Sequence, residues 1–190
     1  MRYSTSLSSR ELELVILLTG ARYESDAEFD IHVDEARRAG VGWDMIRSIP
    51  GGTLLPPSEE EEDDEEEDDD GFSLERVKER VIPALMREHD GVMLPEIRTT
   101  RDVARESEVA IVLFASELLD KNTVCDKTYD ATRDRLHGRD SALVKIVAIV
   151  GYCAFVSCHI KTLFFTQGKL ASATRIMPTQ FGKKERFSPP

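Results

Sequence analysis

The fold is decided by residues 10–49, which read RELELVILLTGARYESDAEFDIHVDEARRAGVGWDMIRSI. Apolar residues recur in this stretch at intervals of three and four, the spacing that turns one face of a helix toward a core. Gly40 predicts a helix end, because the residue that follows a helix often takes a left-handed conformation that glycine adopts freely. The stretch therefore predicts two helices, ending near Arg22 and at Gly40, and a short third helix from Trp43 to Ile49.

Two residue pairs predict how the first two helices begin. Ser8 precedes Glu11 by three positions, and Ser25 precedes Glu28 by the same distance. This is the spacing of a capping box, in which the serine and the carboxylate each accept a hydrogen bond from a backbone N–H at the helix start. One interpretation of Glu28 is accordingly that it only caps the amide of Ser25.

The rest of the chain continues the helical pattern. No segment alternates apolar and polar residues over the length that a half-buried strand needs, so the expected fold class is all-α. Pro83 should bend or shorten the helix that contains it. The further predicted helices run from Leu74 to about Arg87, from Thr100 to Leu119, from a cap at Thr123 to His137-Gly138, and from Ser141 through the last apolar segment.

Negative charge is concentrated in one segment. The net charge is −11, but all 12 residues from Glu59 to Asp70 are acidic, so the rest of the chain carries a net charge of +1. Such a self-repelling run cannot bury apolar surface, and we expect a disordered insertion between two helical halves; binding of a basic partner is the alternative. Basic residues are not interleaved with aromatic ones, so nucleic acid is not an expected partner.

The end of the chain differs from the helical part. Apolar periodicity stops near residue 167, and residues 168–190 hold five basic residues against the single acidic Glu185. We therefore expect one helical domain over residues 8–166, with the acidic insertion at residues 59–70. Residues 167–190 are predicted to be a mobile tail that folds back on the acidic loop or stays free.

Neither a targeting signal nor a membrane span is expected. Residues 1–9 lack the apolar centre of a secretory signal. The longest apolar segment, Ile146–Ile160, has 15 residues, whereas about 20 are needed to cross a bilayer. We interpret it as a buried core helix and expect a cytoplasmic protein with no membrane partner. The three cysteines, Cys125, Cys153 and Cys158, form no Cys-x-x-Cys pair and are interpreted as reduced thiols.

Three polar residues in the opening helices are candidates for chemistry. Glu28 and His32 are four positions apart and so share one face of a helix, while Glu13 lies within the apolar run Leu12–Leu18. Buried carboxylates and imidazoles are costly unless they are paired, and pairing moves their proton affinities. The pattern predicts a proton-handling site made of Glu13, Glu28 and His32; the simpler interpretation is a structural Glu–His hydrogen bond. The set lacks the further ligands of a metal site, so no metal or other cofactor is expected.

The same segments resemble a known family. Leu12–Leu17, Ala21-Arg22, Glu28-Phe29-x-x-His32 and Ala36–Val41 are similar to the carboxymuconolactone decarboxylase-like family of the alkylhydroperoxidase D-like superfamily, and Val147–Tyr152 resembles its later helix. The resemblance covers roughly residues 8–49 and 72–160. It implies an all-helical fold that assembles as trimers or hexamers, and a lyase that acts on a small lactone or a carboxylated cyclic metabolite.

The resemblance also bears on peroxidase activity. The peroxidase branch of the superfamily carries a Cys-x-x-Cys pair ahead of its histidine and an upstream glutamate for proton relay. Ser25 and Glu28 occupy the cysteine positions here, while His32 and Glu13 match the other two. A peroxide-reducing dithiol needs a thiolate and a resolving thiol, so disulfide-cycling peroxidase activity is not expected.

Two functions from different classes fit these residues. In an acid–base enzyme, His32 is the general acid or base, because its ordinary pKa of about 6.5 suits proton transfer at neutral pH; Glu13 orients it and Glu28 polarises the pair. In a non-catalytic oligomeric scaffold or binding module, the fold is kept without the chemistry. Catalysis requires the three residues to converge beside an apolar pocket, whereas a scaffold leaves His32 on a backbone partner with no cavity beside it.

Overall fold

The computed structural model describes residues 7–52, 71–90, 100–136 and 140–175. Within these ranges every regular element is a helix and none is a strand, which confirms the all-α class. The acidic run at residues 59–70 and the end of the chain after Arg175 lie outside the described residues. The elements are α1 (Ser9–Arg22), α2 (Asp26–Arg38), α3 (Trp43–Arg47), α4 (Leu74–Arg76), the π-helical turn η1 (Val77–Val81), α5 (Ile82–Asp90), α6 (Thr100–Lys121), α7 (Asp126–Arg135) and α8 (Asp140–Arg175).

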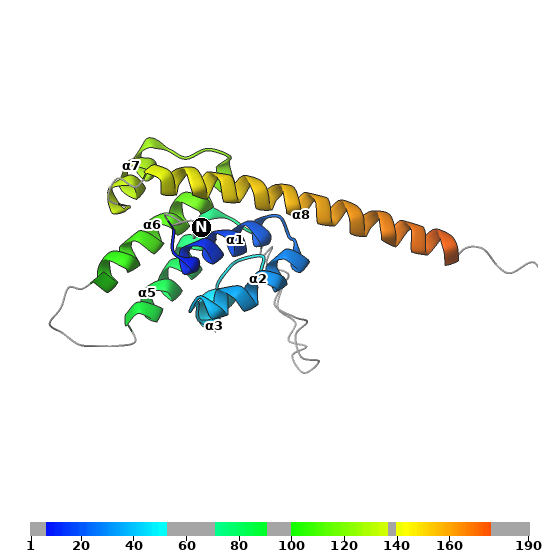
Figure 1. Ribbon diagram of the computed structural model, residues 1–190, viewed down its shortest axis with the longest axis horizontal. Helices are drawn as coiled ribbons and strands as arrows, with labels where there is room; N and C mark the ends of the chain where they lie inside the picture. Colours follow the sequence, from blue (N-terminus) through cyan, green and yellow to red (C-terminus); the bar gives the residue numbers. More distant parts are fainter. Residues whose placement is uncertain (1–6, 53–70, 91–99, 137–139, 176–190) are drawn as a thin grey trace, which may run out of the picture.

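Helix α1 occupies the centre of the bundle, where it contacts α2, α6 and α8 (Figure 1). Its residues Leu14, Val15, Leu17 and Leu18 have no exposed surface, and the intervening Ile16 is also buried. Consecutive buried residues point to every side of a helix, so α1 has to be covered all round. The core around it includes Phe29 of α2, Leu85 of α5, Ile111 of α6 and Ile146 of α8.

The two predicted capping boxes have different outcomes. At α1 the box is present: Ser8 Oγ accepts the Glu11 N–H at 3.1 Å, and the Ser8 N–H donates to the Glu11 carboxylate at 2.6 Å. At α2 the prediction is wrong, because the Ser25 side chain caps nothing and the Ser25 N–H donates to the carbonyl of Gly20 at 2.9 Å. The tight turn between α1 and α2 uses that N–H, which leaves the Glu28 carboxylate available for other contacts.

The predicted end of α2 at Gly40 is confirmed. Gly40 has a φ of 91°, which few residues other than glycine adopt without strain. The N–H of Val41 then donates to the carbonyl of Ala36 at 2.9 Å, the pattern of a Schellman cap. Helix α3 follows directly and ends at Arg47, two residues before the predicted end at Ile49.

Pro83 changes the helix that contains it without ending it. The turn just before it, η1, is π-helical, and the helical path then continues to Asp90, past the predicted end near Arg87. Proline has no N–H to donate, and its ring crowds the carbonyl four residues earlier. A locally wider turn accommodates both effects.

Helix α7 begins later than the sequence predicts. Its N-cap is Cys125, so the predicted cap at Thr123 is wrong. Asn122 takes a left-handed φ of 56° directly after α6, and the chain stays non-helical until Asp126. A serine or threonine after a helix is a weak signal when the connection itself sets the direction of the next helix.

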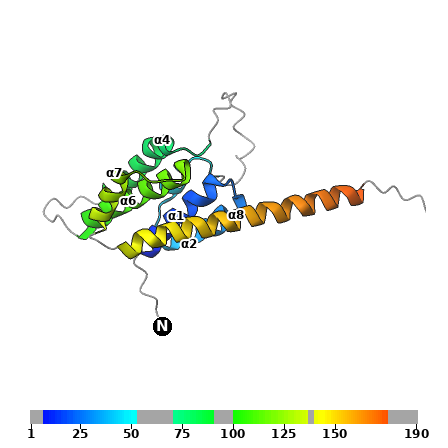
Figure 2. The same cartoon turned by 90° about the horizontal axis from the view of Figure 1, so that it is seen from above.

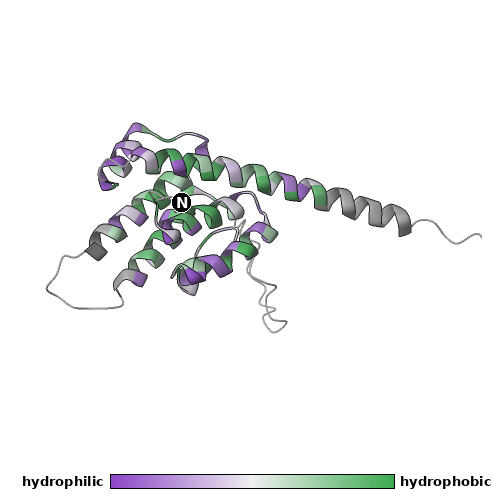
Figure 3. Cartoon of the chain, viewed as in Figure 1, coloured by the Kyte–Doolittle hydropathy of each residue, from purple (hydrophilic) through white to green (hydrophobic). Residues whose placement is uncertain are grey.

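Helix α8 departs most from prediction. It continues to Arg175, so the predicted tail is helical over residues 167–175, and it projects beyond the bundle (Figures 1 and 2). Only 28 % of its most apolar stretch is buried, so the interpretation as a buried core helix is wrong. Figure 3 shows hydrophobic residues along α8 where it leaves the bundle. Among the described residues, the Asp140–Leu163 part of α8 is long and apolar enough to cross a membrane. The core helices of soluble proteins can meet the same criteria of length and composition.

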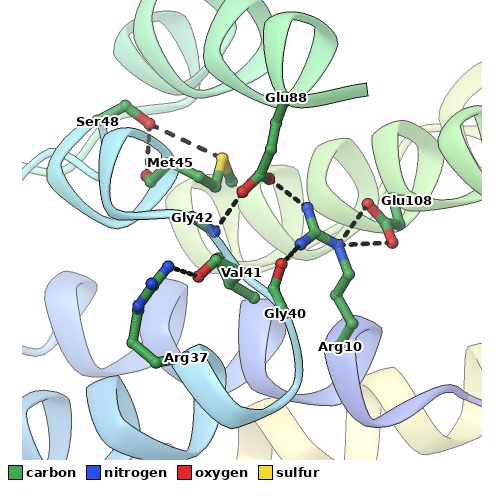
Figure 4. A network of polar contacts seen from close by, with 9 residues as sticks. All are labelled: Arg10, Arg37, Gly40, Val41, Gly42, Met45, Ser48, Glu88 and Glu108. Carbon is green, nitrogen blue, oxygen red and sulfur yellow. Dashed lines mark hydrogen bonds and ion pairs between the residues drawn. The ribbon is translucent and has the colours of Figure 1, made fainter. Parts of the chain in front are cut away.

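A network around Arg10 holds four segments together (Figure 4). Arg10 Nε donates to both oxygens of Glu108 on α6, at 2.9 and 3.1 Å, and its other nitrogens bind the Gly40 carbonyl and Glu88 of α5. Glu88 also accepts the Gly42 N–H. Burial would lower the pKa of Arg10, but the hydrogen bond to Glu88 and the charge of Glu108 outweigh it and raise the pKa. The network fixes the start of α1 against the α2–α3 connection, α5 and α6.

Candidate functional site

The candidate site lies where α1, α2 and α8 meet. His32 Nδ1 of α2 is 2.9 Å from Glu13 Oε2 of α1. The Glu13 side chain is 11 % exposed, whereas that of His32 is 27 % exposed. The imidazole therefore lies at the edge of the core, with one ring nitrogen on a buried carboxylate.

The connection between α1 and α2 brings these two residues together. Glu13 lies on α1 and His32 on α2, on either side of the tight turn at residues 23–25. In this turn Glu24 adopts a positive φ of 47°, and the chain reverses so that α2 packs against α1. The pairing of Glu13 with His32 is one contact of that packing.

Glu28 is directed to α8 and not to the Glu13–His32 pair. It is 5 % exposed, and its carboxylate accepts a hydrogen bond from Ser157 Oγ. No hydrogen bond within the described residues joins Glu28 to His32, which lies one turn further along α2. The three predicted residues are neighbours, but only Glu13 and His32 are directly bonded.

Cys153 of α8 is a member of the cluster that the sequence did not reveal. Burial, followed by the charge of Glu28, a hydrogen bond to Glu28 and the charge of Glu13, raises the pKa of Cys153 from 9.0 to about 12. The thiol is therefore protonated at neutral pH, beside the Glu28 carboxylate. The available sequence signal was the four-residue spacing of Cys153 and Ser157, which places both on one face of an apolar helix.

A cavity of about 570 Å³ lies beside the pair. His32, Glu28 and Cys153 line it, and most of the remaining wall is aliphatic, from α1 and α8. This volume falls in the range of roughly 300–1,000 Å³ that is usual for small-molecule sites. Glu13 is not part of the lining and reaches the cavity only through His32.

A second, larger cavity of about 840 Å³ lies among α4, α6 and α7. Its lining contains none of the predicted site residues and combines lysines, arginines and two glutamates with apolar side chains. Two of its cations are already paired with those glutamates, Lys121 with Glu117 and Arg135 with Glu106. Chemistry that uses His32 belongs to the smaller cavity.

No three His, Cys, Asp or Glu side chains in the described part of the chain are grouped so that they could hold a metal ion. Comparisons of the chain with known protein families, curated proteins and solved structures found no significant match. The geometry of α1, α2 and α8 is therefore the basis of the functional argument.

The raised pKa of Cys153 predicts a pH dependence of stability. Below pH 9 the thiol is protonated in both the folded and the unfolded chain. Between pH 9.0, its ordinary pKa, and about pH 12 the unfolded chain releases this proton first, so the free energy of unfolding falls as pH rises. Urea unfolding of wild type and Cys153→Ala at pH 8, 9.5 and 11 should show wild type losing more stability than the variant. Equal losses in both proteins would place Cys153 in an environment that does not shift its pKa.

Proposed function

We propose that this protein is an acid–base enzyme of the carboxymuconolactone decarboxylase-like type, with the alkylhydroperoxidase D-like helical fold. Its substrate class is a small lactone or carboxylated cyclic metabolite. The observation that carries the proposal is the position of His32, which is bonded to a buried carboxylate and lines an apolar cavity. A histidine with this pair of neighbours meets the geometric condition for a general acid or base.

Glu13 sets the tautomer of His32. An ionised carboxylate only accepts hydrogen bonds, so the imidazole donates to it through Nδ1–H, and Nε2 carries the lone pair. Nε2 takes a proton from the substrate, and the positive charge that develops on the ring is stabilised by Glu13. In a decarboxylation this is the carboxylic acid proton; the C–C bond then breaks, CO₂ leaves, and the imidazolium returns the proton to the carbon that keeps the electron pair. The substrate is neither oxidised nor reduced overall.

Glu28 takes no direct part in the proton transfer. The hydrogen bond from Ser157 holds the Glu28 carboxylate in the cavity wall one helical turn from His32, where its negative charge polarises the Glu13–His32 pair. The Cys153 thiol is protonated at neutral pH, and a protonated thiol is a poor nucleophile. This supports proton chemistry at the site over the alternative of a peroxidase.

Turnover by a His32 variant tests the proposal. Wild type, His32→Ala and His159→Ala are incubated with a panel of lactones and cyclic carboxylic acids, and consumption is followed by mass spectrometry. His159 is an exposed histidine on α8 that does not line the cavity, which makes it a matched control. Wild type and His159→Ala should turn over the same compounds, and His32→Ala should be slower by about 10²-fold or more. No consumption by wild type, or equal rates for His32→Ala, would favour the non-catalytic scaffold.

We also propose that the protein is a cytoplasmic homo-oligomer, a trimer or hexamer, whose subunits associate through α8. The supporting observation is a set of large apolar side chains exposed on that helix. An exposed apolar surface of this extent is unfavourable in water and typical of an interaction site. The exposed residues are Val144, Val147, Tyr152, Phe155 and Leu163, with exposed fractions between 48 % and 69 %.

The oligomer is tested by light scattering on wild type, Phe155→Glu and Tyr129→Glu. Tyr129 is an exposed aromatic residue of α7 and serves as the control. Wild type and Tyr129→Glu should have the mass of the same oligomer, and Phe155→Glu should dissociate, because a carboxylate would be buried in the interface. A monomeric wild type that floats with phospholipid vesicles would instead mean that α8 is covered by lipid.

A further inference from the structure

Lys145 differs from the lysines that have carboxylate partners. Lys78, Lys121 and Lys161 lie 2.7, 3.4 and 3.2 Å from a glutamate oxygen. Lys145 is half-buried on α8 and lines the same cavity as His32, yet it has no hydrogen bond or ion pair within the described residues. A partly buried ammonium without a partner is unfavourable, and an anion in the cavity would relieve that cost.

The position of Lys145 separates it from the proton-transfer end of the cavity. Lys161 pairs with Glu24 and Ser157 with Glu28, so α8 runs antiparallel to α2. Lys145 precedes Cys153 by two helical turns, a rise of about 12 Å. Lys145 therefore lies at one end of the α8 wall of the cavity, two turns away from Cys153 near the middle of that wall.

The cavity chemistry restricts the ligand. Besides Lys145, the ionisable groups in the lining are Glu28, His32, Tyr152 and Cys153, and Glu28 is already bonded to Ser157. Lys145 is the one lysine or arginine in this lining, and a single ammonium matches the single negative charge of a carboxylate better than the double charge of a phosphate dianion. The aliphatic walls favour an apolar skeleton on the rest of the ligand.

We infer that Lys145 binds a carboxylate that an otherwise apolar substrate keeps through the reaction, and so sets which end of the substrate reaches His32. The inference rests on the proposed function and adds to it the residue that determines charge specificity. Lys145 is a specificity residue and takes no part in the proton transfer. The reacting carbon lies at the His32 end of the bound molecule, away from the carboxylate that Lys145 holds.

Equilibrium binding of two probes tests the inference. The probes are 3-phenylpropionate and 3-phenylpropanamide, which have nearly the same shape and differ in charge. Calorimetry on wild type should give a dissociation constant about tenfold lower for the acid than for the amide, which corresponds to about 1.4 kcal/mol. Lys145→Met should remove this preference by weakening the acid alone, and Lys145→Arg should retain it because the charge is kept. Lys161→Met is the control, since Lys161 lies on the same helix and pairs with Glu24.

Three results would overturn the inference: equal affinities for the two probes in wild type, failure of both probes to bind, or a preference for the acid that survives in Lys145→Met. Thermal unfolding of each variant checks that the fold is intact. The readout is binding and not turnover, so it separates the two proposals. A preference for the acid without any turnover would support the Lys145 site and contradict the proposed enzyme. Turnover without a preference for the acid would support the enzyme and contradict the Lys145 site.

Discussion

The central constraint on this molecule is that α1 is buried on every side while carrying charged residues. A charge in such a helix has to be matched by a partner on a neighbouring element, because an unpaired buried charge is strongly unfavourable. Arg10 is matched by Glu88 and Glu108, and Glu11 by Ser107, at 2.7 Å. Glu13 is matched by His32. Together the pairings connect α1 to α5, α6 and α2, so the charges of the helix contribute to how the bundle is assembled.

The candidate site is a consequence of one of these pairings. Arg10 and Glu11 are matched on the side of α1 that faces α5 and α6, where the network is closed. Glu13 faces α2 and α8, and its partner His32 keeps more than a quarter of its side chain exposed. The cavity beside His32 is lined by residues of α1, α2 and α8. The pairing with Glu13 thus holds an imidazole at the wall of an apolar cavity.

Local signals in the sequence predicted the helical fold and most of its boundaries. The capping box at Ser8 and the left-handed Gly40 depend only on nearby residues, and both were read correctly. The pair of Ser25 and Glu28 has the same local signal, but the turn before α2 takes the Ser25 N–H and tertiary contacts take Glu28. A local pattern fails where a distant element offers a better partner.

Two predictions failed for a related reason: that α8 is buried in the core, and that the site consists of Glu13, Glu28 and His32 alone. Apolar composition does not tell whether a helix lies in a core or projects from it, since that depends on how many neighbours reach it. Cys153 and Ser157 were missed because they lie more than 120 positions from Glu28 in sequence and meet it only through the antiparallel packing of α2 and α8. Glu13 and His32 were found because burial and helical phase are visible locally, whereas their contact depends on the turn.

The central claim is that Glu13 and His32 form one coupled unit, and a double-mutant cycle measures this directly. Free energies of unfolding are determined in urea for wild type, Glu13→Ala, His32→Ala and the double variant. Because either single change already breaks the hydrogen bond, the effects should be non-additive by about 1–3 kcal/mol. A parallel cycle of Glu28→Gln and His32→Ala should be closer to additive, since these residues are not bonded to each other. Simple additivity of Glu13→Ala and His32→Ala would mean that the two side chains are independent, and it would remove the pairing on which the proposed chemistry depends.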